Sequence, residues 1–152
     1  MKKLVIKAAL ISTLVLAGNA HAETTTGNAS ATILGTITFV EDAAIAYGSI
    51  PFVSSGTCTM AAAGALSGDC TGTGTAGAFT VTGTNGEGAA ISVSAGTTVD
   101  GVVFAPTLLS SATDTFNGSD EISVSVGGSL TYPASSVSGV KNFTYTLTVN
   151  YN

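Results

Sequence analysis

Side chains that could carry out chemistry are few in this chain of 152 residues. It holds nine Asp or Glu residues, four Lys or Arg residues, two cysteines and one histidine. A Ser-His-Asp triad and a Cys-His pair each need an imidazole, which only His21 provides. His21 falls within the segment that we assign below to a signal peptide. We therefore expect no nucleophilic catalysis from the exported chain.

Adjacent carboxylates are the remaining candidates for general acid and base catalysis. They occur as Glu41-Asp42 and Asp120-Glu121. Neighbouring residues on a strand point to opposite faces, so neither pair converges on one scissile bond. Solvated acids at turns explain both pairs more simply. The sequence predicts that the protein is not an enzyme and uses no cofactor.

The two cysteines, Cys58 and Cys70, lie close together in the sequence. An exported chain in an oxidising compartment normally pairs such cysteines, and closing so short a loop adds about 3 kcal/mol of stability. A metal site is the competing interpretation, but it needs two further thiolate or imidazole ligands that the exported chain lacks. The segment 114–121 is rich in oxygen ligands without matching the spacing of a calcium loop. We predict a disulfide and no metal site.

The first 22 residues have the three regions of a secretory signal peptide. Lys2 and Lys3 give a basic start, residues 4–17 are mostly apolar, and Ala20 and Ala22 are the small residues that a signal peptidase reads. The apolar run is short for a membrane span, and no stop-transfer pattern follows it, which disfavours a retained anchor. We predict cleavage after Ala22, and export with no membrane insertion afterwards.

The charge of the exported chain excludes several classes of partner. Only 9% of all residues are charged, and Lys141 is the single basic side chain after residue 22. Nucleic-acid binding depends on several Lys or Arg contacts to phosphates, so we exclude it. An anionic membrane surface would repel the nine acids.

Apolar and polar residues alternate with a period of two, which is typical of half-buried strands. No helix is expected after the signal peptide, except for one possible turn over residues 61–66. The pattern predicts about seven or eight short strands joined by Gly-rich turns, as in an all-β sandwich. The predicted strands are residues 29–40, 44–50, 78–82, 90–95, 101–104, 121–126, 129–132 and 142–152.

The C-terminal strand carries the clearest alternation. Its apolar positions are Phe143, Tyr145, Leu147, Val149 and Tyr151, and the intervening residues are all polar. Gly139 shares the parity of this stripe, and Tyr151 is the penultimate residue. A glycine, an alternating stripe and a penultimate aromatic together resemble the C-terminal motif of pilins assembled by the chaperone–usher pathway.

A second match to these pilins lies near the N-terminus. Residues Ala29, Ala31, Ile33, Gly35, Ile37 and Phe39 alternate with mostly polar neighbours. This pattern resembles the donor strands of pilins, which alternate apolar residues and carry a glycine. Three segments, 46–50, 78–83 and 143–151, also resemble a family of small secreted bacterial β proteins that is often described as fimbria-like.

The resemblance implies an immunoglobulin-like β-sandwich that lacks its last strand. Residues 1–22 are then the signal peptide, residues 23–40 the donor strand or else the first strand of the chain's own sheet, and residues 41–152 the sandwich. The groove strand, which a chaperone contacts, comprises Gly139 and the C-terminal stripe. Cys58 and Cys70 are closer together than the cysteines of better-known pilins, which leaves open the strands that they join.

The function implied is that of a structural subunit of a cell-surface fimbria that supports adhesion or biofilm formation. Its partners would be copies of itself, a periplasmic chaperone and an outer-membrane usher. The alternative is a monomeric secreted β-sandwich that binds a glycan or a surface protein. Such a module normally displays an exposed aromatic platform, whereas most aromatic residues here have the parity of a core.

Overall fold

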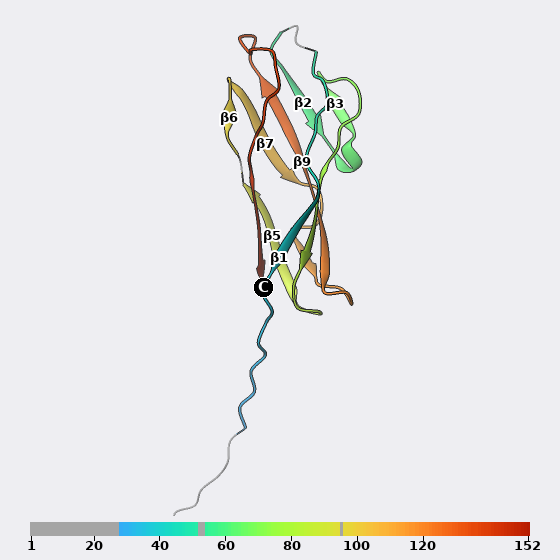
Figure 1. Ribbon diagram of the computed structural model, residues 1–152, viewed down its shortest axis with the longest axis vertical. Coiled ribbons are helices and arrows are strands. Elements are labelled where there is room, and N and C mark those ends of the chain that lie inside the picture. Colours follow the sequence, from blue (N-terminus) through green and yellow to red (C-terminus); the bar gives the residue numbers. More distant parts are fainter. Residues whose placement is uncertain (1–27, 52–53, 95) are drawn as a thin grey trace, which may run out of the picture. The chain divides into compact units, whose positions relative to one another are not determined.

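Alternating side chains build two antiparallel sheets in the computed structural model (Figure 1). The larger sheet has the order β1 (Thr38–Ala43), β4 (Gly77–Thr82), β9 (Glu121–Tyr132), β2 (Gly56–Met60) and β3 (Leu66–Gly68). Two further strands belong to it. β7 (Val102–Leu108) pairs with β9, and β6 (Thr98–Val99) pairs with β7. The smaller sheet has the order β10 (Thr146–Tyr151), β5 (Gly88–Ser94) and β8 (Thr113–Thr115). The predicted all-β, sandwich-like fold is confirmed.

The structure describes residues 28–51, 54–94 and 96–152. The predicted signal peptide, residues 1–22, lies outside the described residues. Residues 33–152 form one unit, to which all the strands belong. Within the described part, the one helical element is a short 3-10 turn, η1 (Ala62–Gly64), at the place where the sequence indicates a possible turn.

Strand β9 is the common partner of three other strands. It pairs with β4 through residues 121–126 and with β2 through residues 128–132. It also pairs with β7 through residues 126–131. The sequence predicts two strands here, at residues 121–126 and 129–132, and this is wrong because Gly127 and Gly128 continue the strand instead of ending it.

The close approach of β7 explains why glycine stands in the middle of β9. A Cβ atom on Gly128 would lie 2.2 Å from the carbonyl oxygen of Ala105 on β7, and its φ of +143° disfavours any side chain. A Cβ atom on Gly127 would lie 2.7 Å from the Leu109 side chain. These glycines therefore allow two backbones to pack closely within one sheet.

Two hydrophobic clusters fill the sandwich. The first brings together the inner faces of both sheets, through Val81 of β4, Ile91 of β5, Ile122 of β9 and Val149 of β10. The second lies over the part of the large sheet formed by β2, β7 and the end of β9, and it contains Cys58, Met60, Phe104, Leu130 and Tyr132. Val81, Val126 and Cys58 are fully buried.

Several predicted strand limits differ from the observed ones. Residues 44–50 form only a single bridge, between Ala46 and Thr75. The last strand begins at Thr146 rather than residue 142. The strand predicted at residues 101–104 continues to Leu108. Strands β2, β3 and β8 lack a clean apolar alternation and were not predicted.

Candidate functional site

An apolar groove runs between two segments that are far apart in the sequence. One side is lined by residues 44–50, which follow β1, and the other by residues 136–145, which precede β10. Buried side chains of β7 and β9 lie beneath them, namely Val102, Phe104, Leu130 and Tyr132. The groove has a volume of about 870 Å³, which is within the range of ligand-binding clefts.

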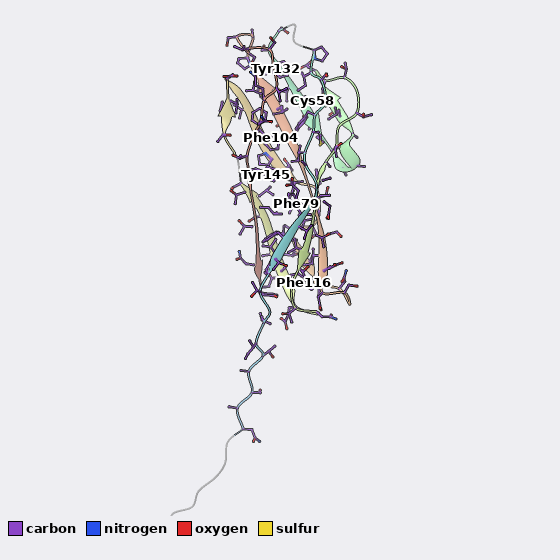
Figure 2. All side chains as sticks on the ribbon, in the orientation of Figure 1. Cys58, Phe79, Phe104, Phe116, Tyr132 and Tyr145 are labelled. Atoms are coloured by element: carbon purple, nitrogen blue, oxygen red, sulfur yellow. A yellow bond between two sulfur atoms is a disulfide. The ribbon has the colours of Figure 1, made fainter. Side chains whose placement is uncertain are left out.

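Aromatic rings form the base of the groove, and Phe104 is at their centre (Figure 2). The Phe104 ring lies 6.1 Å from the ring of Tyr47, 6.0 Å from that of Phe143 and 5.9 Å from that of Tyr145. Tyr145 also meets Phe79 edge-on at 6.4 Å, which connects the groove to the first cluster. Rings at these distances pack favourably and hold one another in place.

Three hydroxyl groups at the groove are buried without a hydrogen-bond partner among the residues that the structure describes. They belong to Tyr47, Ser136 and Tyr145, all of which line the groove. Burial raises the pKa of Tyr47 to about 12. Burial, with a smaller contribution from the negative charge of Glu41, also raises the pKa of Tyr145. Both phenols are therefore neutral at physiological pH and can donate as well as accept hydrogen bonds.

The two strands beside the groove are both edge strands. In the described part of the chain, β1 pairs only with β4, and β10 pairs only with β5. β1 reaches the groove through Glu41, and β10 follows directly after Tyr145. The groove thus lies beyond the end of β1 and before the start of β10, two strands that each have an open edge.

A model of a protein family described as a domain of unknown function (DUF4402) matches residues 37–151, which is more than half of the chain. The chain belongs to the DUF4402 family. The match runs from Ile37, just before β1, to Tyr151, the last residue of β10, so the DUF4402 domain is the sandwich itself. Searches of curated proteins and of solved structures found no match.

A cluster of hydrogen bonds joins the last residue of the DUF4402 domain to the segment just before the domain and to the turn after β4. The Tyr151 hydroxyl donates to the Gly35 carbonyl oxygen at 2.9 Å and accepts from the Thr84 amide at 2.8 Å. The Gly35 amide donates to the Thr84 Oγ1 at 2.7 Å. The Tyr151 ring also packs against Phe116, with the ring centroids 5.6 Å apart. Figure 1 shows the C-terminus beside the start of β1.

The predicted donor residues fall into two groups on either side of Gly35. Ala29, Ala31 and Ile33 are exposed, and Ile33 keeps 92% of its surface accessible. They precede the DUF4402 domain. Ile37 packs against the first cluster. Phe39 lies in β1 opposite Val81, so Ile37 and Phe39 serve the chain's own sandwich, which was the alternative assignment.

The predicted C-terminal stripe also divides into two parts. Phe143 and Tyr145 line the groove, together with Gly139, whose φ of +128° lies in the left-handed region. Leu147, Val149 and Tyr151 belong to β10 and face the first cluster. The alternation is therefore continuous, but only its first half contributes to the groove.

Cys58 and Cys70 form the predicted disulfide, with their Cα atoms 5.2 Å apart. Cys58 lies in β2, and Cys70 follows β3. β2 and β3 pair with each other, so the bond closes this hairpin and does not link the two segments that line the groove, residues 44–50 and 136–145. The Tyr132 hydroxyl donates to the carbonyl oxygen of Asp69 at 3.1 Å, which attaches the hairpin to the end of β9.

The acidic side chains of the DUF4402 domain are dispersed. Asp42 accepts a hydrogen bond from the Thr80 hydroxyl at 2.8 Å, and Asp100 forms an ion pair with Lys141 at the groove. The Asn117 Oδ1 accepts hydrogen bonds from the amides of Ser119 and Glu121, as expected of a polar turn.

In the described residues, no three His, Cys, Asp or Glu side chains gather as a metal site would require. None of the described helices is long and apolar enough to span a membrane.

Tyr47, Ser136 and Phe104 carry no sequence pattern that predicts a site. The one sequence signal for Tyr47 is its alternation with Ile45 in the segment 44–50, which indicates a buried position there but not a groove. Ser136 lies in a segment with no periodicity. The groove assembles residues from positions 41 to 145, and no local pattern reports such a long-range arrangement.

Proposed function

We propose that this protein is a structural subunit of a cell-surface fimbria and that it assembles head to tail. Each chain would insert the segment preceding its Gly35 into the groove of the next chain. The observation that carries this proposal is the apolar groove between residues 44–50, which follow β1 and form a single bridge, and residues 136–145, which precede β10 and belong to no strand. An open sheet edge beside an apolar groove accepts an added strand, which supplies backbone hydrogen bonds and side chains together.

The segment before Gly35 has the properties of an inserted strand. Ala29, Ala31 and Ile33 alternate with Ser30 and Thr32, and all five are exposed. Burial of a fully exposed isoleucine contributes about 1.5–3 kcal/mol, and the Ile33 side chain is 92% exposed. The segment precedes the DUF4402 domain, so its donation leaves the matched sandwich intact.

Insertion of one chain into the next is a heterologous contact, because the donated segment and the groove are different surfaces. Such contacts repeat without closing and generate open filaments. A subunit of this kind needs no catalytic group. Exported through the periplasm, it would require a chaperone strand in the same groove before assembly and an outer-membrane usher to order it at the cell surface.

The test compares two substitutions in the exported chain, residues 23–152. Ile33→Asp places a charge on the side of the segment that enters the groove, and Thr32→Asp places the same charge on the opposite side. We expect Ile33→Asp to abolish filaments in sedimentation and electron microscopy, and Thr32→Asp to retain them.

Both substituted residues are exposed, so each variant should melt at the temperature of the unsubstituted chain. Equal assembly of the two variants would contradict the proposal. A chain that stays monomeric at every concentration tested would instead favour the secreted binding module.

A further inference from the structure

The groove contains more polar chemistry than a purely apolar strand would satisfy. The hydroxyls of Tyr47, Ser136 and Tyr145 are buried at the groove and lack a partner among the described residues. Tyr47 approaches from the side that follows β1, whereas Ser136 and Tyr145 belong to the side that precedes β10. Unpartnered hydroxyls therefore stand on both sides of the same groove.

Three such groups in one place are unusual for a folded protein. Most buried side-chain polar atoms in native structures have a partner, because a buried hydroxyl without one loses its hydrogen bonds to water. The other tyrosines of the described chain follow this rule, since Tyr132 donates to Asp69 and Tyr151 to Gly35. The exceptions coincide with the groove, which points to an occupant that supplies the missing bonds.

We infer that Tyr47, Ser136 and Tyr145 hold the groove's occupant by hydrogen bonding to the backbone of an extended peptide, which is residues 24–34 of a second copy of this chain. This inference rests on the proposed function and names residues that add affinity to the contact between two chains. A hydroxyl both donates and accepts, so it can pair with either the N–H or the C=O groups that alternate along an extended strand.

The composition of residues 24–34 fits the groove in two respects. The segment contains no charged residue, so its insertion would bring no unpaired charge of its own into the groove. Its inward positions include the small residues Ala29 and Ala31. Small side chains leave room for the rings of Tyr47 and Tyr145 to approach the peptide backbone.

The experiment measures the affinity of a fluorescent peptide, residues 24–36, for the exported chain carrying Ile33→Asp. That substitution prevents the acceptor's own segment from competing. Tyr47→Phe, Ser136→Ala and Tyr145→Phe each remove one hydroxyl and little else. We expect each to weaken peptide binding by about three- to tenfold, the loss of one hydrogen bond. Without peptide, we expect each of these variants to melt at the same temperature as the chain carrying only Ile33→Asp, or at a higher one, because an unpartnered buried hydroxyl has been removed.

Thr131→Val provides the matched control. It removes an exposed hydroxyl of β9 that shares a hydrogen bond with the Thr57 hydroxyl at 3.3 Å and does not line the groove, so peptide affinity should be unchanged. Weaker binding without a lower melting temperature in the three groove variants supports the inference. Unchanged affinity in all three overturns it and leaves the proposed function standing. Weaker binding with a lower melting temperature assigns the hydroxyls a structural role and also overturns it. If the peptide does not bind the acceptor itself, the proposed function fails as well.

Discussion

The Tyr151 hydroxyl donates a hydrogen bond to the Gly35 carbonyl oxygen at 2.9 Å, across 116 residues of sequence. The same hydroxyl accepts from the Thr84 amide, so one atom joins β10, the segment before β1 and the turn after β4. This contact marks the point at which the N-terminal segment joins the sandwich. In the proposed filament, it sets how much of that segment a chain can donate.

Tyr151→Phe should destabilise the domain at this point. It removes the bond to Gly35 and leaves the partly buried Thr84 amide without its acceptor, so we expect a loss of about 1–3 kcal/mol in the free energy of unfolding. Denaturant unfolding measures this loss. Tyr145→Phe is the matched comparison, because its hydroxyl has no partner and its removal should cost nothing. Equal losses in the two variants would contradict this account.

Reduction of the disulfide should lower stability without opening the groove. The bond between Cys58 and Cys70 closes a loop with a sequence separation of 12, for which chain entropy gives about 3 kcal/mol. Thermal melts with and without a reductant measure the effect. The double variant Cys58→Ala with Cys70→Ala should melt at a lower temperature and no longer respond to the reductant. If a reductant still lowered the melting temperature of that variant, the disulfide would not be the cause of the reductant's effect.

Gly128→Ala should disrupt the large sheet. The added methyl would lie 2.2 Å from the Ala105 carbonyl oxygen, and the φ of +143° is unfavourable for alanine. Strain and overpacking together should cost about 2–4 kcal/mol, measurable by chemical denaturation. Gly118→Ala is the control, because a Cβ atom there has open space. A stable Gly128→Ala protein would mean that β7 and β9 can separate at this point.

The stability of the domain should decline at alkaline pH through Tyr47. Burial raises its pKa to about 12 in the folded chain, whereas an unfolded tyrosine ionises near 10. The stabilising effect is complete below about pH 10 and is lost as the pH rises through the folded pKa, because only the unfolded state has then released the proton. Tyr47→Phe should make the alkaline fall in melting temperature shallower. An identical fall in both proteins would contradict this assignment.

Local patterns predicted the strands that combine a buried face with a solvated one. β4, β5 and β10 each alternate, and the sequence placed all three close to their observed positions. β2 has the composition Gly-Thr-Cys-Thr-Met and lacks an apolar stripe; it forms because β9 and β3 pair with its two edges. Gly127 and Gly128 resemble a turn in the sequence, and only the approach of β7 explains their place within a strand.

The groove was less accessible to sequence reasoning than the strands. The alternating apolar stripe that begins at Phe143 indicates one side of the groove, because Phe143 and Tyr145 share its parity and both line the groove. The other side, with Tyr47, was predicted as an ordinary strand, and its lack of pairing depends on where β1 ends. Whether a hydroxyl finds a partner depends on three-dimensional packing, so the unpartnered groups could not be recognised in advance.

The position of β9 has a consequence for how the chain acquires its structure. Strands β2, β4 and β7 do not pair with one another, and each of them joins the large sheet through β9. All three are complete before synthesis reaches Glu121, where β9 begins. Until then the described strands of the emerging polypeptide can form only the separate hairpins β2–β3 and β6–β7 and the pairs β1–β4 and β5–β8, each with an edge open to aggregation. The large sheet therefore closes in a single late step, and nascent chains are most vulnerable just before it.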